Sequence, residues 1–209
     1  MSGDIGHLQR LTNDQVTSRI ASYGEDGRFE AALRRLWDDA GTIIEQAASN
    51  HFGEDVGSLG RDHFTKPVDE AWVRSVAEQG LKMFAGKRSV PEFIAARARM
   101  VKEVIRGFDE CFKGRTDERI EALDTFYRVL SFSEDIILAQ IALLEANDAA
   151  DQRGRQSEQF ESRVADLVRN STEQSKALTD RTRATAASAR GMLGKTSEVA
   201  AAAEQSAVA

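Results

Sequence analysis

Apolar side chains recur every three or four residues along four stretches before about residue 150, which is the spacing of one helix face. No stretch alternates apolar and polar side chains as a half-buried strand does. The four stripes run over residues 29–47, 72–83, 93–112 and 120–144. Pro91 opens the third, since the first turn of a helix tolerates a missing backbone donor, and the glycines of segment 52–62 indicate a loop. The pattern predicts an all-α protein whose four helices close on a shared core.

Beyond about residue 150 the pattern changes to a strict spacing of seven residues. Aromatic side chains end at Phe160, and Ala, Ser, Thr, Gln and charged residues become abundant. Arg181 and Lys195 stand where leucine would stabilise a helical seam, so this helix needs a second helix to cover it. The series, which is typical of supercoiled helices, consists of Val164, Ser171, Leu178, Thr185, Met192, Val199 and Ser206.

Composition narrows the class of protein. The 209 residues are 41% hydrophobic and include ten Phe, enough to bury a sizeable core. The net charge of −6 is spread over interleaved acidic and basic residues, which argues against nucleic acid as the main partner. No run reaches the roughly 20 apolar residues that cross a bilayer, and the N-terminus lacks an apolar signal core. We therefore expect a cytoplasmic protein without a membrane span.

Candidate chemistry is sparse. The single cysteine, Cys111, lies near an apolar face and is predicted to be a reduced thiol at the edge of the core. The acidic pair Asp38 and Asp39 is predicted to lie on a solvated helix face. No nucleophile with a nearby histidine and no phosphate-binding glycine loop is present, so we do not expect an enzyme.

Four segments in a fixed order resemble the globin-coupled sensors, in particular the soluble aerotaxis-type chemoreceptors. The segments are LRRLWDDAGTIIEQAASNHF, SVAEQGLKM, VPEFIAARARMVKEVIRGF and DTFYRVLSFSEDIILAQIALLEA. They are similar to the family's early helix with its distal aromatic pair, its proximal-ligand helix, the next helix, and the last globin helix, which continues into a signalling coil. The resemblance implies a globin-like sensor domain over residues 1–152 and the start of a coiled-coil signalling region, which we expect to be truncated, over residues 153–209.

The end of the chain resembles the methylated region of chemotaxis receptors. In AAAAEQSAVA, a Glu-Gln pair lies among small residues, so the resemblance implies Glu204 and Gln205 as candidate methylation sites. An ordinary solvent-facing pair is the other interpretation. The resemblance also implies a homodimer formed through the last sensor helices and the coil, with a downstream kinase or adaptor as partner.

The histidine that binds haem iron in this family has no counterpart here. Alignment through VAEQGLKM places it at Gly80, counting back from Pro91 places it at Phe84, and no histidine follows His63. Its loss removes the usual anchor of the haem iron. We therefore favour a haem-free signalling globin. Its pocket is either filled by side chains or open to another small apolar or anionic ligand, and the lining residues would be Trp37, Phe84, Phe93 and Met100.

Two alternatives remain open. One keeps haem with unusual axial ligands and senses a gas or redox state: His51 lies where the family has its distal pair, and Met83 is the nearest substitute on the proximal side. Against it, His51 suits a helix-end role and Met83 suits the core, while His7 and His63 are predicted to lie on the surface. The other alternative is an oligomerisation module that senses nothing.

Overall fold

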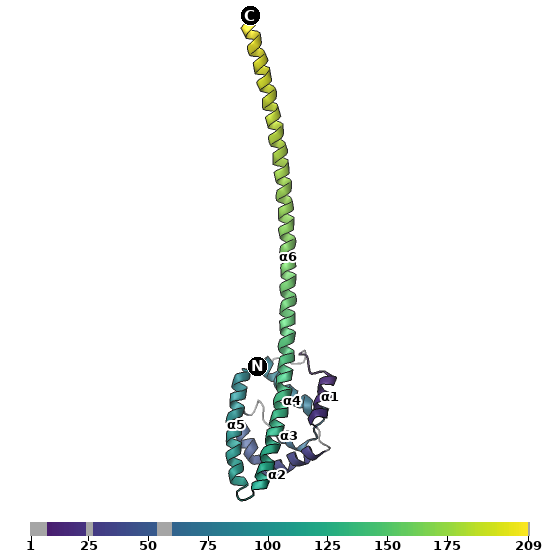
Figure 1. The fold of residues 1–209 in the computed structure, drawn as a ribbon, viewed down its shortest axis with the longest axis vertical. Coiled ribbons are helices and arrows are strands. Elements are labelled where there is room, and N and C mark those ends of the chain that lie inside the picture. Colours follow the sequence, from purple (N-terminus) through teal and green to yellow (C-terminus); the bar gives the residue numbers. More distant parts are fainter. Residues whose placement is uncertain (1–7, 24–26, 54–59, 209) are drawn as a thin grey trace. The chain divides into compact units, whose positions relative to one another are not determined.

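The computed structural model describes residues 8–23, 27–53 and 60–208, with side chains described as far as residue 203. Within these ranges the protein is all-α, as predicted, with six helices and no strand. None of the described helices combines the length and apolar character needed to cross a membrane. The helices are α1 (Asn13–Tyr23), α2 (Arg28–Phe52), α3 (Arg61–Thr65), α4 (Glu70–Ala85), α5 (Val90–Cys111) and α6 (Thr116–Val208) (Figure 1).

The four helices predicted from the apolar spacing correspond to α2, α4, α5 and α6, and α1 and α3 are additional. Side-chain caps determine where two of the four begin. The Asp69 carboxylate accepts a hydrogen bond of 2.9 Å from the main-chain nitrogen of Trp72 and starts α4. Ser89 caps α5 in the same manner, and Pro91 occupies its first turn, as predicted.

The chain divides into two units, residues 1–149 and residues 150–209. The first contains α1 to α5 and the beginning of α6. Its core is formed by most of the predicted apolar positions together with Leu11, Val16, Tyr23 and Phe64, whereas Ile120 and Tyr127 of the predicted fourth stripe are exposed. Phe108 of α5 meets Phe126 of α6 edge to face, with ring centroids 5.7 Å apart. Cys111 is half-buried at the end of α5, with Sγ 3.5 Å from the main-chain oxygen of Asp39, which confirms its position at the edge of the core.

Two glycines allow helices of the first unit to approach closely. A Cβ atom at Gly107 of α5 would lie 2.3 Å from the Ile43 side chain of α2. A Cβ atom at Gly80 of α4 would lie 2.8 Å from the main-chain oxygen of Ile137 in α6 and 3.0 Å from Cβ of Gln140. The contact at Gly80 is the stricter one, because a helical main-chain oxygen cannot rotate aside as a methyl group can. Gly80 therefore determines how closely α6 packs on α4.

Gln140 fastens residues 9–13, here called the N-terminal strap, to α6. Its side chain is fully buried. Its Oε1 accepts a hydrogen bond of 3.1 Å from the main-chain nitrogen of Leu11, and its Nε2 donates one of 2.8 Å to the main-chain oxygen of Gln9. Arg74 of α4 donates to Asn13 at 2.7 Å. A buried amide without partners is costly, so the strap satisfies both ends of a side chain that would otherwise destabilise the core.

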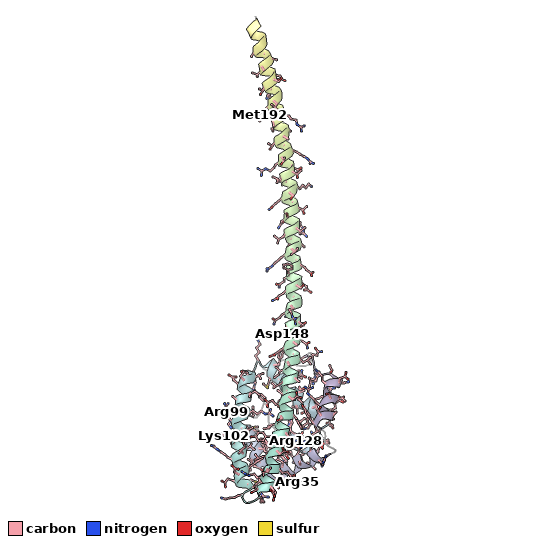
Figure 2. The ribbon with its side chains drawn as sticks, in the orientation of Figure 1. Arg35, Arg99, Lys102, Arg128, Asp148 and Met192 are labelled. Carbon is pink, nitrogen blue, oxygen red and sulfur yellow. The ribbon has the colours of Figure 1, made fainter. Side chains whose placement is uncertain are left out.

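The second unit is the remainder of α6, in which every described side chain, over residues 150–203, is exposed. Met192 is one of the apolar side chains that project from it (Figure 2). A helix that buries nothing depends on backbone propensity alone, which is marginal in water. The large apolar side chains exposed along it are Phe160, Val164, Leu167, Val168, Leu178, Met192, Leu193 and Val199.

We expect Gly80→Ala to lower the free energy of unfolding of the first unit by about 1–3 kcal/mol. Overpacking a close contact costs this much, and it outweighs the roughly 1 kcal/mol that alanine gains over glycine in a helix. Urea unfolding followed by the fluorescence of Trp37 and Trp72, which both lie in this unit, measures the change. Gly191→Ala is the matched control, since nothing lies within 4 Å of its added Cβ atom. A Gly80→Ala midpoint equal to or above that of the parent contradicts the close contact.

Candidate functional site

The residues predicted to line a haem or ligand pocket lie on three helices. Met83 of α4 and Met100 of α5 are fully buried in the core, and Phe93 of α5 is also buried. Trp37 of α2 and Phe84 of α4 are half-buried. The predicted pocket residues are therefore divided between the core and its margin.

Aromatic residues of this set pack on protein neighbours. The Trp37 ring stacks on Phe64 of α3, with centroids 5.1 Å apart. It also covers Gly41, where a Cβ atom would lie 2.8 Å from the indole. Phe93 contacts Phe52 at the end of α2, with centroids 5.6 Å apart. The Trp37 and Phe93 rings are therefore in contact with aromatic side chains of the protein itself.

His51 lies in the last turn of α2 and is engaged with a carboxylate. Its Nε2 lies 2.8 Å from Oε2 of Glu103 on α5, and the Asn50 amide donates to the other oxygen of that carboxylate at 2.7 Å. The imidazole thus links the end of α2 to α5. His51 thus lies at the end of its helix, and its Nε2 is engaged by the Glu103 carboxylate.

The residues at the predicted haem site do not fit a haem group. Gly80, one of the two positions aligned with the family's histidine, is in contact with α6 and has no side chain. Phe84, the other, offers no iron ligand, and the Met83 thioether is 1% exposed within the hydrophobic core. These positions therefore provide no accessible axial ligand for a haem iron.

His63 lies in α3 and is 8% exposed, so the prediction that it is a surface residue was wrong. Its Nδ1 has no hydrogen-bond partner in the described structure, and its Nε2 lies 3.4 Å from the side-chain nitrogen of Gln79. The Trp72 indole donates to the main-chain oxygen of His63 at 3.1 Å. Burial lowers the pKa of this imidazole, outweighing the main-chain group of Gly60 and the nearby Asp62 carboxylate, which both raise it. His63 is thus a neutral ring held between α3 and α4.

Arg97 is a second buried polar residue that sequence reasoning did not place. It lies on α5 and donates a hydrogen bond from Nη2 to the main-chain oxygen of Leu130 in α6. Its Nε lies 3.9 Å from Glu134, and burial lowers the pKa of its guanidinium to about 10. It therefore stays charged at neutral pH and joins α5 to α6, whereas Arg99, on the outer side of α5 in Figure 2, is exposed.

Glu204 and Gln205, the candidate methylation sites, fall within the span of α6, and their side chains lie outside the described residues. His7 also lies outside the described residues. No group of three or more His, Cys, Asp or Glu side chains able to hold a metal ion occurs in the described part of the chain.

Comparison of the chain with protein-family models, curated proteins and solved structures found no match. The resemblance to globin-coupled sensors therefore stays a prediction.

We expect the free energy of unfolding of the first unit to fall as the pH is lowered from about 7.5 to about 5.5, and part of this fall to come from His63. The pKa of His63 is lowered in the folded state, so the unfolded chain binds the proton first as the pH falls through about 6.5. The stabilisation is complete above that pH and is lost below it. For one group the slope is at most about 1.4 kcal/mol per pH unit.

Urea unfolding at several pH values, compared between the parent and His63→Leu, isolates this contribution. The variant should show the shallower dependence on pH, because it lacks the group that titrates only in the unfolded chain. His51→Gln serves as the control, since His51 is the other histidine in the described residues. Equal slopes for the parent and His63→Leu would count against a neutral, buried imidazole.

Proposed function

We propose that this protein is a cytoplasmic signal-transduction sensor with a globin-like, haem-free head. In this proposal it forms a homodimer through α5, α6 and the seam beyond residue 150, and α6 relays a change in the head to a chemotaxis-type coiled coil. A downstream kinase or adaptor would read the change. The chain would have no catalytic role.

The continuity of α6 is the observation that carries this proposal. One helix, Thr116–Val208, supplies core residues to the first unit and then forms the whole of the second. In the first unit it presents buried residues such as Phe126 and Ile137, and in the second its apolar side chains are exposed. A rotation or tilt of α6 at the core would therefore be carried along the same backbone to the seam.

Exposed apolar side chains along the second unit support a self-associating seam. Leu178, Met192 and Val199 belong to the seven-residue series, and each is about two-thirds exposed (65%, 65% and 68%). A second copy of this helix would remove such side chains from water. Because hydroxyl and charged residues occupy other seam positions, the association would be weak enough to have two arrangements of similar energy.

Buried polar contacts that α6 makes with α5 and with the N-terminal strap form a second part of the relay in our proposal. Arg97 holds the main-chain oxygen of Leu130, and Gln140 holds the N-terminal strap, so two buried polar groups depend on the position of α6. On the exposed side of the same helix, Ile120 and Tyr127 are 57% and 46% exposed and lie seven residues apart, as in a helix–helix interface. In our proposal this face meets the partner's head.

An oligomerisation module without a sensing role is the second candidate. The close packing of Trp37 on Phe64 and the burial of Met83 and Met100 favour it, because they leave the predicted pocket filled. The two candidates agree on the homodimer and differ on whether a ligand changes it.

Sedimentation equilibrium of the full chain tests the homodimer. We expect a dimer that Leu178→Lys weakens by at least about tenfold in Kd, since the change places a charge at the centre of the seam. Glu173→Lys is the control, because it adds the same side chain two positions after Ser171, off the seam. A monomer at every concentration, or equal losses in the two variants, would refute the seam.

A visible absorption spectrum, recorded on the purified chain before and after addition of excess haem, tests the haem-free head. We expect no stoichiometric Soret band, because the aligned positions carry Gly80 and Phe84. A band of full intensity that disappears in His51→Ala, Met83→Ala or His63→Leu would instead establish a haem sensor and identify its ligand.

A further inference from the structure

A half-open cavity of about 170 Å³ lies between α2 and the beginning of α6, away from the predicted pocket. Its apolar lining includes Leu36 of α2, Ala122 of α6 and Phe112, which follows α5, and all three are buried. Its volume is about five to six times the share of one water molecule in the liquid. The cavity therefore has room for a ligand with a short hydrocarbon body.

Thr125 provides this cavity with a hydroxyl group that the protein itself does not use. The residue lines the cavity and is only 3% exposed, yet its hydroxyl enters no hydrogen bond within the described residues. Ser133, the other buried hydroxyl residue in the described part of α6, behaves differently: it donates to the main-chain oxygen of Val129, four residues earlier, at 2.7 Å. The Thr125 hydroxyl oxygen is not one of the fully buried unpartnered atoms, so a ligand or water in the cavity can reach it.

The charged residues of the lining determine which sign of charge the cavity favours in a ligand. It comprises one arginine, Arg35, and three carboxylates, those of Asp39, Glu118 and Glu121. Arg35 pairs with Glu121 at 2.9 Å, and Glu118 pairs with Arg115 at 2.8 Å. The Asp39 carboxylate has no ion pair or hydrogen bond in the described part of the chain. Arg35, near the lower end of the first unit in Figure 2, is thus already neutralised, which leaves the cavity acidic.

We propose that this cavity binds a small primary amine in its protonated form. An ammonium group offers three N–H donors and no acceptor, and the cavity offers acceptors in the Asp39 and Glu121 carboxylates and the Thr125 hydroxyl. The hydrocarbon body of the amine covers Leu36, Ala122 and Phe112. An anion of the same size would meet an excess of carboxylates and is excluded.

Binding of an amine in this cavity would affect α6, the helix that carries the signal in the proposed function. Thr125 and Ala122 belong to α6, and Leu36 belongs to α2, so a bound amine contacts both helices at once. The step from binding to signalling rests on the proposed function, but binding itself does not, because the whole cavity lies within one chain. Sedimentation and amine binding are therefore independent measurements, and either can fail alone.

NMR titration of the ¹⁵N-labelled full chain with n-pentylamine tests the site, with pentan-1-ol and pentanoate as neutral and anionic probes of similar length. We expect saturable shifts of amides in residues 32–39 and 118–125, and an affinity for the amine at least about tenfold above that for the alcohol. Pentanoate should cause no saturable shift. An amine affinity equal to that for the alcohol, or saturable shifts confined to other residues, overturns the proposal.

Variants at the cavity sharpen the test. Asp39→Asn should weaken amine binding about two- to fivefold, which is the effect of losing an exposed charge pair. Thr125→Val should weaken it about threefold or more, because one hydrogen bond is lost. Asp38→Asn is the matched control, because Asp38 is also exposed on α2 and does not line the cavity. Equal weakening by Asp38→Asn and Asp39→Asn would reduce the effect to general electrostatics and refute a defined site.

Discussion

The contact between α4 and α6 at Gly80 constrains most of the first unit. The missing Cβ atom brings the main chain of α6 against α4, so the stem of Gln140 lies beside α4 and its amide reaches the N-terminal strap. The position at which sequence alignment placed an iron ligand is thus used for helix packing. A larger residue there would separate two helices and deprive a fully buried amide of its partners.

Buried polar groups are concentrated where helices meet. Gln140, Arg97 and His63 each have a side chain that burial would penalise, and main-chain oxygens or nitrogens of another segment supply partners for the first two. His63 differs, because one ring nitrogen has no partner in the described structure and its main-chain oxygen carries the contact to Trp72. The structure of the first unit is consequently determined by buried polar contacts as well as by burial of apolar surface.

The sequence predicts the helical class and the core faces well, because periodic spacing is a local signal. Pro91 and the stripe of Trp72, Val76 and Met83 appear where expected. Five-residue α3 is too short to show a period, so the burial of His63, which depends on Trp72 and Gln79, was missed. The cavity at Thr125 likewise depends on helices distant in sequence. Thr125 differs from Ser133, the other buried hydroxyl residue in the described part of α6, in lacking a hydroxyl-to-backbone bond, and that difference is visible in coordinates alone.

The Gly80 contact also limits how α6 can move. Bringing the next residue of α6 in place of Ile137 at this contact would require α6 to turn by about 100° and would carry Gln140 away from the strap, because neighbouring residues of a helix differ by that angle around its axis. Tilting about Gly80 keeps the amide near its partners and changes only the direction of the helix. The contact therefore favours tilting of α6 over turning about its own axis, so that a change at Gly80 alters the direction of α6 within the first unit.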